Sequence, residues 1–243
     1  MYVLAINFKS YKTSYGSRAL SIAKEADSVA REYSGLVRVV LLPPATEIVR
    51  IASAVSFSSV FAQHVDPVDE GAYTGHVTAE MIKEAGATGI MINHSEKRLR
   101  IDEISFILGK ARKLGLETLV CADTPEVAAA ISVLSPHMLA IEPPELIGTG
   151  IPVSKAKPEV VTGTVNKVRE LNKEVLILTG AGITTGDDVK AAIRLGTQGV
   201  LVASAVMKAQ EPSKIIKEMT ESLIKALDPL PPALQDGGEG LNA

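Results

Sequence analysis

The chain has 243 residues, of which 46% are hydrophobic, a length that suits a single α/β barrel with a large core. A formal net charge of only −3 without a basic run excludes nucleic acid as an expected partner, and Cys121, the only cysteine, excludes an intramolecular disulfide. The N-terminal segment MYVLAINFKS does not resemble a signal peptide and no apolar run is long enough to cross a bilayer, so we expect a cytoplasmic protein without a membrane partner.

Short apolar runs alternate with longer segments of helical periodicity along the chain. In the segment 17–33, for example, Leu20, Ala23 and Ala30 fall on one helical face. Several of the apolar runs lack in–out alternation, as expected of parallel strands that are buried on both faces. The predicted strands are 2–7, 36–42, 59–62, 89–92, 118–121, 137–141, 175–179 and 199–202.

Turn and cap residues support the same division of the chain. Thr124-Pro125 is typical of a helix start, and Gly86, Gly115 and Gly196 each follow a helical segment. Eight strand–helix units predict a (β/α)8 barrel in one domain, residues 1–227, although an open doubly wound sheet remains an alternative. Residues 228–243 are rich in Pro and Gly and predict a loosely attached tail.

Polar residues follow the first and fourth predicted strands. The carboxyl ends of barrel strands meet on one face, so Asn7, Phe8 and Lys9 are candidates to line a site there, with Lys9 as a cation for a phosphate or an oxyanion. His94 begins the run NHSEKR, where a helix start would favour a neutral imidazole that polarises a carbonyl. The alternatives are a solvated lysine and a histidine that caps a helix.

Glu142 follows the sixth predicted strand directly. Pro143-Pro144 comes next, and Gly148 and Gly150 supply a second hinge after three ordinary residues. A carboxylate beside a segment with one stiff and one flexible end is typical of a catalytic base under a lid. An exposed glutamate in an ordinary connection is the alternative.

The loops after the seventh and eighth strands contain small residues, among them Gly182, Ala203 and Ser204. Such loops let backbone N–H groups approach an anion, and barrels often bind phosphate at this position. With a carboxylate base, a neutral imidazole and a cation, the set suits proton transfer next to a carbonyl of a phosphorylated substrate. No spacing indicates a metal site, a nucleotide or another cofactor, so we expect none.

Two rival functions remain at this point. A Schiff-base aldolase would need a lysine on a central strand, and the strand HMLAI has none. A catalytically silent phosphosugar-binding barrel would not need Lys9, His94 and Glu142 together.

The segments NFK at 7–9, GAYTGHV at 71–77, NHSEKR at 93–98 and IEPPELIGTG at 141–150 resemble the triosephosphate isomerase family, in order and across nearly all of residues 1–227. The resemblance implies a TIM barrel that interconverts dihydroxyacetone phosphate and D-glyceraldehyde 3-phosphate in glycolysis and gluconeogenesis. It implies Glu142 as the base, His94 as a neutral electrophile and Lys9 as the stabilising cation. Asn7 would line the site and Glu96 would support it.

The resemblance also implies a phosphate site and an assembly. Phosphate would be held by main-chain groups around Ile147, Gly182 and Ala203-Ser204, while Thr74 in the loop 71–77 would brace the site of a neighbouring subunit. Lys97, Pro144-Glu145 and Ala203-Ser204 depart from the common pattern, in which Arg, Val-Trp and a glycine pair stand there. With the short barrel, these departures resemble the archaeal branch, whose members are often homotetramers.

Overall fold

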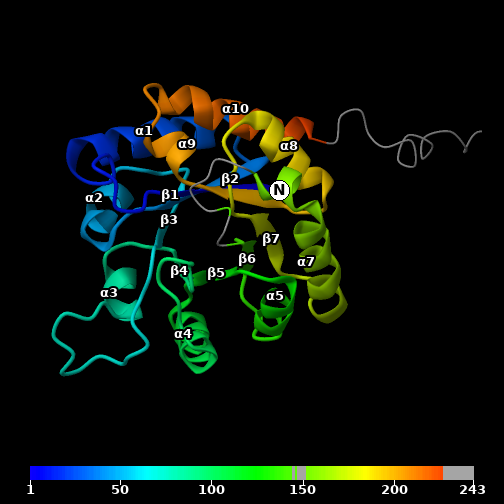
Figure 1. The fold of residues 1–243 in the computed structure, drawn as a ribbon. Helices are drawn as coiled ribbons and strands as arrows, with labels where there is room; N and C mark the ends of the chain where they lie inside the picture. The colour runs from blue at the N-terminus through cyan, green and yellow to red at the C-terminus, as the bar shows by residue number, and fades with distance from the viewer. Residues whose placement is uncertain (144–145, 147–151, 227–243) are drawn as a thin grey trace, which may run out of the picture.

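Eight parallel strands form a closed barrel with helices around it (Figure 1). The computed structural model describes residues 1–143, 146 and 152–226. Because β1 pairs with β8 as well as with β2, the sheet closes, which confirms the (β/α)8 barrel over the open sheet. The strands are β1 (Tyr2–Asn7), β2 (Val37–Leu42), β3 (Ser59–Ala62), β4 (Gly89–Ile92), β5 (Glu117–Ala122), β6 (Met138–Ile141), β7 (Leu176–Thr179) and β8 (Gly199–Val202).

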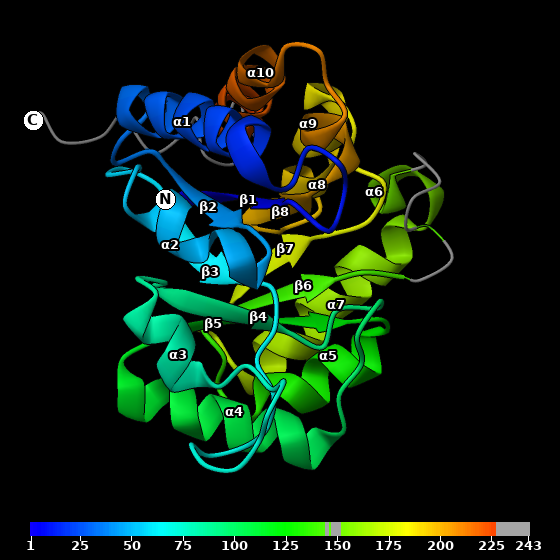
Figure 2. The same cartoon turned by 90° about the vertical axis from the view of Figure 1, so that its left-hand side faces the viewer.

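Helices follow the strands and cover the outside of the barrel. The helix α1, predicted at 17–33, runs from Gly16 to Glu32 and lies beside α10 on one flank (Figure 2). Thr124 caps α5 as predicted, because its side chain accepts a bond from the Val127 N–H, and Gly115 ends α4 with a φ of 68°. The helices are α1 (Gly16–Glu32), α2 (Ile48–Ala52), α3 (Ala79–Glu84), α4 (Ile101–Leu114), α5 (Pro125–Ser132), α6 (Val153–Ala156), α7 (Pro158–Leu171), α8 (Gly186–Arg194), α9 (Ser204–Met207) and α10 (Pro212–Lys225), with a 3₁₀ turn η1 (Ala45–Glu47) before α2.

Alternate strand residues build two apolar layers. On β1, Val3 and Ala5 belong to the cluster inside the barrel, whereas Leu4 and Ile6 belong to the cluster between strands and helices. The inside is tightly filled, because a Cβ added to Gly89 would lie 2.5 Å from the Phe61 ring. The barrel is therefore a packed core, and a ligand can enter only at one of its ends.

The amino-terminal end of the barrel is closed by an ion pair. Arg38 of β2 reaches across to Glu117 of β5 and donates to both carboxylate oxygens, at 2.7 and 2.5 Å. It also donates to the Ser59 hydroxyl at 3.0 Å. This closure leaves the carboxyl-terminal end of the strands as the open mouth.

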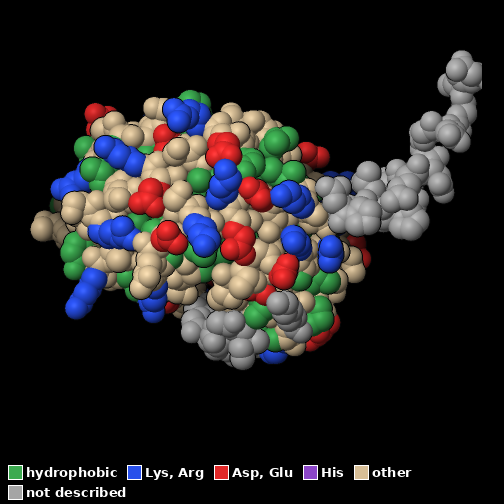
Figure 3. Space-filling view, turned by 90° about the horizontal axis from the view of Figure 1, so that it is seen from above, with side chains coloured by type: hydrophobic (Ala, Val, Ile, Leu, Met, Phe, Trp, Pro, Cys, Tyr) green, Lys and Arg blue, Asp and Glu red, His purple; other side chains and the backbone are tan. Residues whose placement is uncertain are grey.

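The surface carries mixed charges. Over the helices at the top of Figure 1, acidic and basic side chains are interspersed (Figure 3), and Lys217 of α10 pairs with Glu32 of α1 at 2.7 Å. Among the described residues, no helix combines the length and apolar character needed to cross a membrane. The predicted tail, 228–243, lies outside the described residues.

Candidate active site

The carboxyl ends of the strands bring most of the predicted site residues into one pocket, called here the strand-end pocket. Asn7 and Lys9 come from the end of β1, His94 from β4 and Glu142 from β6. The glycine-containing loop after β7 and the small residues after β8 form the opposite wall. The lining residues are Asn7, Lys9, Tyr11, His94, Glu142, Gly180, Gly182, Ile183, Thr184, Leu201, Val202, Ala203 and Ser204.

The His94 ring is held in one orientation. Its Nδ1 accepts the backbone N–H of Glu96 at 3.1 Å, and its Nε2 lies 3.4 Å from Oε1 of Glu142. Because the first contact uses the lone pair of Nδ1, a neutral ring carries its proton on Nε2, which faces the pocket. The side chain is thus arranged to donate a hydrogen bond to a ligand.

The helix start predicted at His94 is wrong. A turn does begin there, with the Lys97 N–H bonded to the His94 carbonyl at 2.8 Å, but α4 begins only at Ile101. The N–H that reaches the ring therefore belongs to the turn residue Glu96 and not to a helix terminus. A single local hydrogen bond, and not the terminus of a helix, therefore meets the Nδ1 atom of His94.

Glu142 is buried at the bottom of the pocket. Its side chain is 3% exposed, and its Oε2 has no hydrogen-bond partner among the described residues. A buried carboxylate oxygen without a partner is costly, so such a group is retained where it acts on a ligand. Gly180 makes room for it, since a Cβ at that position would lie 2.5 Å from the Cγ of Glu142.

Cys121 lies behind Glu142, inside the barrel. Burial raises the pKa of the Cys121 thiol well above its usual range, and the negative charge of Glu142 raises it further. The sequence-based interpretation of Cys121 as a small core residue agrees with its full burial.

We expect iodoacetamide at about pH 8 to leave Cys121 unmodified in the folded protein, because a thiol with a raised pKa carries almost no thiolate there. The same reagent should modify it fully after unfolding in guanidinium chloride, as measured by intact mass. Rapid modification of the native protein would contradict the burial of this thiol.

Lys9 lies at the mouth of the pocket. Its Nζ is 2.8 Å from Oε1 of Glu96, and its backbone N–H donates to Oδ1 of Asn7 at 2.9 Å. The Glu96 side chain is largely exposed whereas that of Lys9 is mostly buried, so the pair lies at the rim of the pocket, where we expect Lys9 to exchange Glu96 for an anionic ligand. Lys9 supplies the positive charge closest to Glu142 and His94 in the pocket lining.

Backbone groups form the wall opposite Lys9. Gly182 has a φ of 71°, in the left-handed region that glycine adopts without strain. Within the described part of the chain, the N–H groups of Gly182, Ala203 and Ser204 donate to no other group. Free N–H groups that converge from two loops favour binding of an anion.

The remaining predicted residues do not all reach the pocket. Phe8 is not among the lining residues, because its side chain packs in the outer apolar cluster and its N–H donates to the Leu42 carbonyl. Ile147, Pro144-Glu145 and Gly148–Gly150 of the predicted lid lie outside the described residues. Leu146 is described and packs against Val161 and Ala181.

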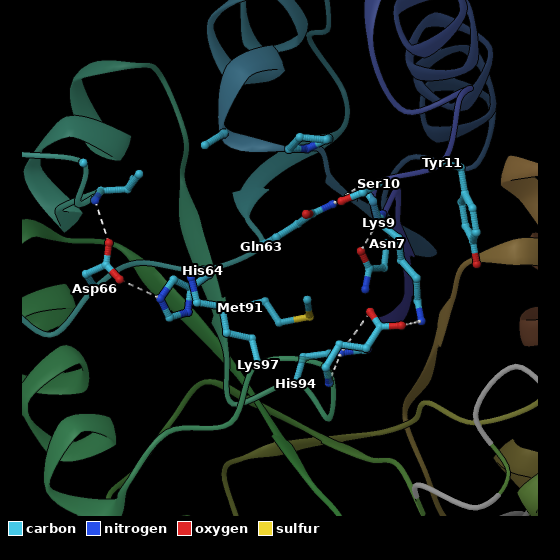
Figure 4. A pocket seen from close by; sticks show the side chains of 15 residues that line it. Asn7, Lys9, Ser10, Tyr11, Gln63, His64, Asp66, Met91, His94 and Lys97 are labelled. Atoms are coloured by element: carbon cyan, nitrogen blue, oxygen red, sulfur yellow. Dashed lines mark hydrogen bonds and ion pairs between the residues drawn. The ribbon is translucent and has the colours of Figure 1, made fainter.

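A second cavity of about 620 Å³ adjoins the strand-end pocket and is called here the side cavity (Figure 4). Both cavities are lined by Asn7, Lys9, Tyr11 and His94. The predicted site residue Glu96 lines only the side cavity, with Ser10, Pro44, Ala45, Gln63, His64, Asp66, Gly75, Val77, Met91 and Lys97.

Sequence reasoning missed Tyr11 and Gln63 and gave Gly180 no separate role. Tyr11 and Gln63 belong to no recognisable pattern, so only their place in the fold identifies them. Gly180 lies in the TGAG run that was noted for its glycines, which was a usable signal. Among the described residues, no cluster of His, Cys, Asp and Glu is placed to hold a metal ion.

The fold and the site define a class of enzyme: a (β/α)8 barrel whose strand ends combine a buried carboxylate, an oriented imidazole and a cation. The triosephosphate isomerase family model matches residues 2–219. The chain is 47% identical to a triosephosphate isomerase of Saccharolobus solfataricus, with 93% of this chain and 97% of the relative covered. It is 48% identical to those of Metallosphaera sedula, over 93% of this chain and 97% of the relative, and Methanocaldococcus jannaschii, over 89% and 98%.

The chain therefore belongs to the triosephosphate isomerase family. The enzyme class that follows is an intramolecular aldose–ketose isomerase, and the archaeal origin of these relatives agrees with the resemblance to the shorter archaeal branch.

Proposed function

We propose that this enzyme interconverts dihydroxyacetone phosphate and D-glyceraldehyde 3-phosphate through an enediol(ate), as a step of glycolysis and gluconeogenesis. The observation that carries the proposal is the pairing of Glu142 and His94, whose Oε1 and Nε2 atoms lie 3.4 Å apart at the bottom of one pocket. A carboxylate and a neutral imidazole at this separation can act on adjacent atoms of one small substrate.

Glu142 is the base that moves the proton. It removes a proton from one carbon next to the carbonyl and returns it to the neighbouring carbon. Burial strips water from the carboxylate, and the free Oε2 leaves a lone pair available for the substrate. The carbon skeleton is unchanged, and a second proton moves from the hydroxyl oxygen to the former carbonyl oxygen, so one carboxylate serves the carbon proton transfer in both directions.

His94 and Lys9 stabilise the negative charge that develops on the substrate oxygens. The Nε2–H of His94 donates to the oxygen that changes between carbonyl and hydroxyl, because its Nδ1 is already used. Lys9 supplies the positive charge, the Asn7 side chain accepts the Lys9 backbone N–H, and Glu96 pairs with the Lys9 ammonium group.

The substrate phosphate binds at the wall opposite Lys9. The free N–H groups of Gly182, Ala203 and Ser204 support this assignment. We assign Ile147 to the same phosphate as part of a lid that closes over the site and prevents loss of phosphate from the enediolate. Ile147 itself lies outside the described residues.

Isomerisation in D₂O tests the proton-transfer mechanism. We expect the product to carry deuterium at the carbon that accepts the proton, because a carboxylate exchanges its proton with solvent during turnover. Nuclear magnetic resonance of the isolated product measures this incorporation. Complete absence of deuterium at that carbon would mean that the transferred hydrogen never exchanges with solvent, and would contradict the exchange expected at the Glu142 carboxylate.

We further propose that the active unit is at least a dimer. The loop 71–77 projects from the barrel between β3 and α3, and its residues from Gly71 to His76 are exposed (Figure 1). Asp66 holds its base, since Asp66 and Val77 exchange backbone and side-chain hydrogen bonds. A preformed exposed loop and an open side cavity next to Lys9 support insertion of this loop into a partner, where Thr74 braces the site.

A second contact would assemble dimers into a homotetramer. Apolar side chains are exposed on α4 and α5, and a groove of about 470 Å³ lies between these helices. Exposed apolar side chains around one groove are typical of a protein interface. The exposed apolar residues are Ile101 and Phe106 of α4, Val127 of α5 and Val133, which directly follows α5.

An arginine introduced into either contact should dissociate the assembly at that contact alone. We expect Ile101→Arg to convert tetramers to dimers with little loss of activity, and Thr74→Arg to abolish the dimer and most of the activity. Leu171→Arg, at an exposed position on α7, serves as the control. Light scattering after size exclusion gives the masses, and an unchanged mass for both variants would rule out this arrangement.

The single cysteine supports a cytoplasmic location, because such compartments keep thiols reduced. We also propose that the chain divides into a barrel domain, 1–227, and a tail, 228–243.

A further inference from the structure

The backbone of Lys9 has an unusual conformation. Its φ is 50°, in the left-handed region that residues with a side chain rarely adopt. Such a conformation persists only when the surroundings hold it in place. The direction in which the Lys9 side chain leaves the backbone therefore depends on the groups that restrain this residue.

Two side chains restrain Lys9 from opposite sides. Asn7 accepts the Lys9 N–H at 2.9 Å, and Gln63, which follows β3, donates from Nε2 to the Lys9 carbonyl at 3.2 Å. The same Nε2 donates to the Leu42 carbonyl at 2.8 Å, so one amide group joins the ends of β1, β2 and β3. In Figure 4, Gln63 extends from β3 toward the Lys9–Ser10 backbone.

Gln63 does not line the strand-end pocket, although it lines the side cavity. It therefore has no position from which to contact the substrate. Both hydrogens of its amide are used by backbone carbonyls, and one of those carbonyls belongs to the strained residue.

We propose that Gln63 is a positioning residue that holds Lys9 in the left-handed conformation and so directs its ammonium group into the active site. This inference rests on the proposed role of Lys9. Without the Gln63 amide, Lys9 relaxes toward negative φ, its Cα–Cβ bond turns, and Nζ leaves the place where the substrate charge develops. Shifts of about 1 Å in such groups reduce rates by about 10²-fold.

The variant Gln63→Met tests the inference, because Met has a similar length and donates no hydrogen bond. Gln198→Met is the matched control: Gln198 Nε2 donates to the Gly196 carbonyl at 2.7 Å, at the closed end of the barrel and away from both cavities. We expect Gln63→Met to lower kcat/KM by about 10- to 100-fold and Gln198→Met by less than about 2-fold. Melting temperature and oligomer mass are measured for both.

A double-mutant cycle with Lys9→Met separates positioning from a purely structural role. In the Lys9→Met background we expect Gln63→Met to cause no further loss of kcat/KM, because the group that it positions is gone. An equal loss in both backgrounds, or equal effects of the Gln63 and Gln198 variants, would overturn the inference. If Lys9→Met itself retained activity, the proposed role of Lys9 would fall instead, which is a distinguishable result.

A second variant covers the case in which Gln63→Met fails to fold. Gln63→Glu keeps the length and shape of the side chain but offers acceptors to the two carbonyls in place of donors. It should reproduce the loss of kcat/KM, and wild-type kcat/KM in this variant would also overturn the inference.

Discussion

The variant Glu142→Asp should lower kcat by about 10²- to 10⁴-fold while substrate affinity changes little. The shorter side chain withdraws the carboxylate by about 1.5 Å, the length of one carbon–carbon bond. Glu142 is 3% exposed and its surroundings are packed, so the carboxylate cannot recover this distance by moving as a whole. The phosphate and the carbonyl oxygen still meet the other groups of the site, which preserves affinity.

Steady-state kinetics of the coupled isomerase assay measure this effect, and Glu142→Gln should lose activity as well because an amide is not a base. Glu126→Asp is the control, since Glu126 is an exposed residue on α5 that pairs with Lys167 at 2.8 Å. A kcat for Glu142→Asp within a factor of about two of the wild-type value would remove Glu142 from the mechanism.

The variant Gly180→Ala should lower kcat/KM by about 10²-fold, although the substitution adds only a methyl group. The φ of Gly180 is not in the left-handed region, so alanine fits the backbone. The new Cβ would instead lie 2.5 Å from Cγ and 3.0 Å from Oε1 of Glu142, which forces the catalytic carboxylate to move. The loss is therefore expected in the rate and only to a small extent in the folding stability.

Gly163→Ala provides the matched control, because a Cβ there meets only Pro125 at an ordinary 3.6 Å. Gly163 lies within α7, where alanine should stabilise the helix by about 0.5–1 kcal/mol without changing kcat/KM. Kinetics and denaturant unfolding of both variants give the comparison. Wild-type kcat/KM in Gly180→Ala would mean that the carboxylate of Glu142 works from a different position.

Much of the fold could be predicted from the sequence because its local signals agree with one another. Every observed strand begins and ends within one residue of its predicted bounds, and α1 differs from its prediction by one residue at each end. Apolar runs and cap residues such as Thr124 act over a few neighbouring positions, so they can be read without knowledge of the rest of the chain.

The helix start predicted at His94 is wrong because contacts beyond the local sequence stabilise a different structure there. The charged run after His94 is typical of a helix beginning, yet the Asn93 side chain accepts the Leu99 N–H at 2.9 Å and donates to the Cys121 carbonyl at 2.9 Å. These contacts stabilise an irregular segment between the strand and Ile101. A long-range hydrogen bond to β5 cannot be read from the local pattern.

The sequence by itself determined the order of eight strands and helices, and it indicated Lys9, His94 and Glu142 as strand-end residues of one site. Only the tertiary structure decided how these groups are held: the Glu96 N–H on His94, the space beside Gly180 for Glu142, and the Gln63 amide on the strained Lys9. The physical reason is range. Periodicity and capping depend on neighbours in sequence, whereas the orientation of a catalytic side chain depends on contacts between strands far apart in the chain, which exist only once the barrel has closed.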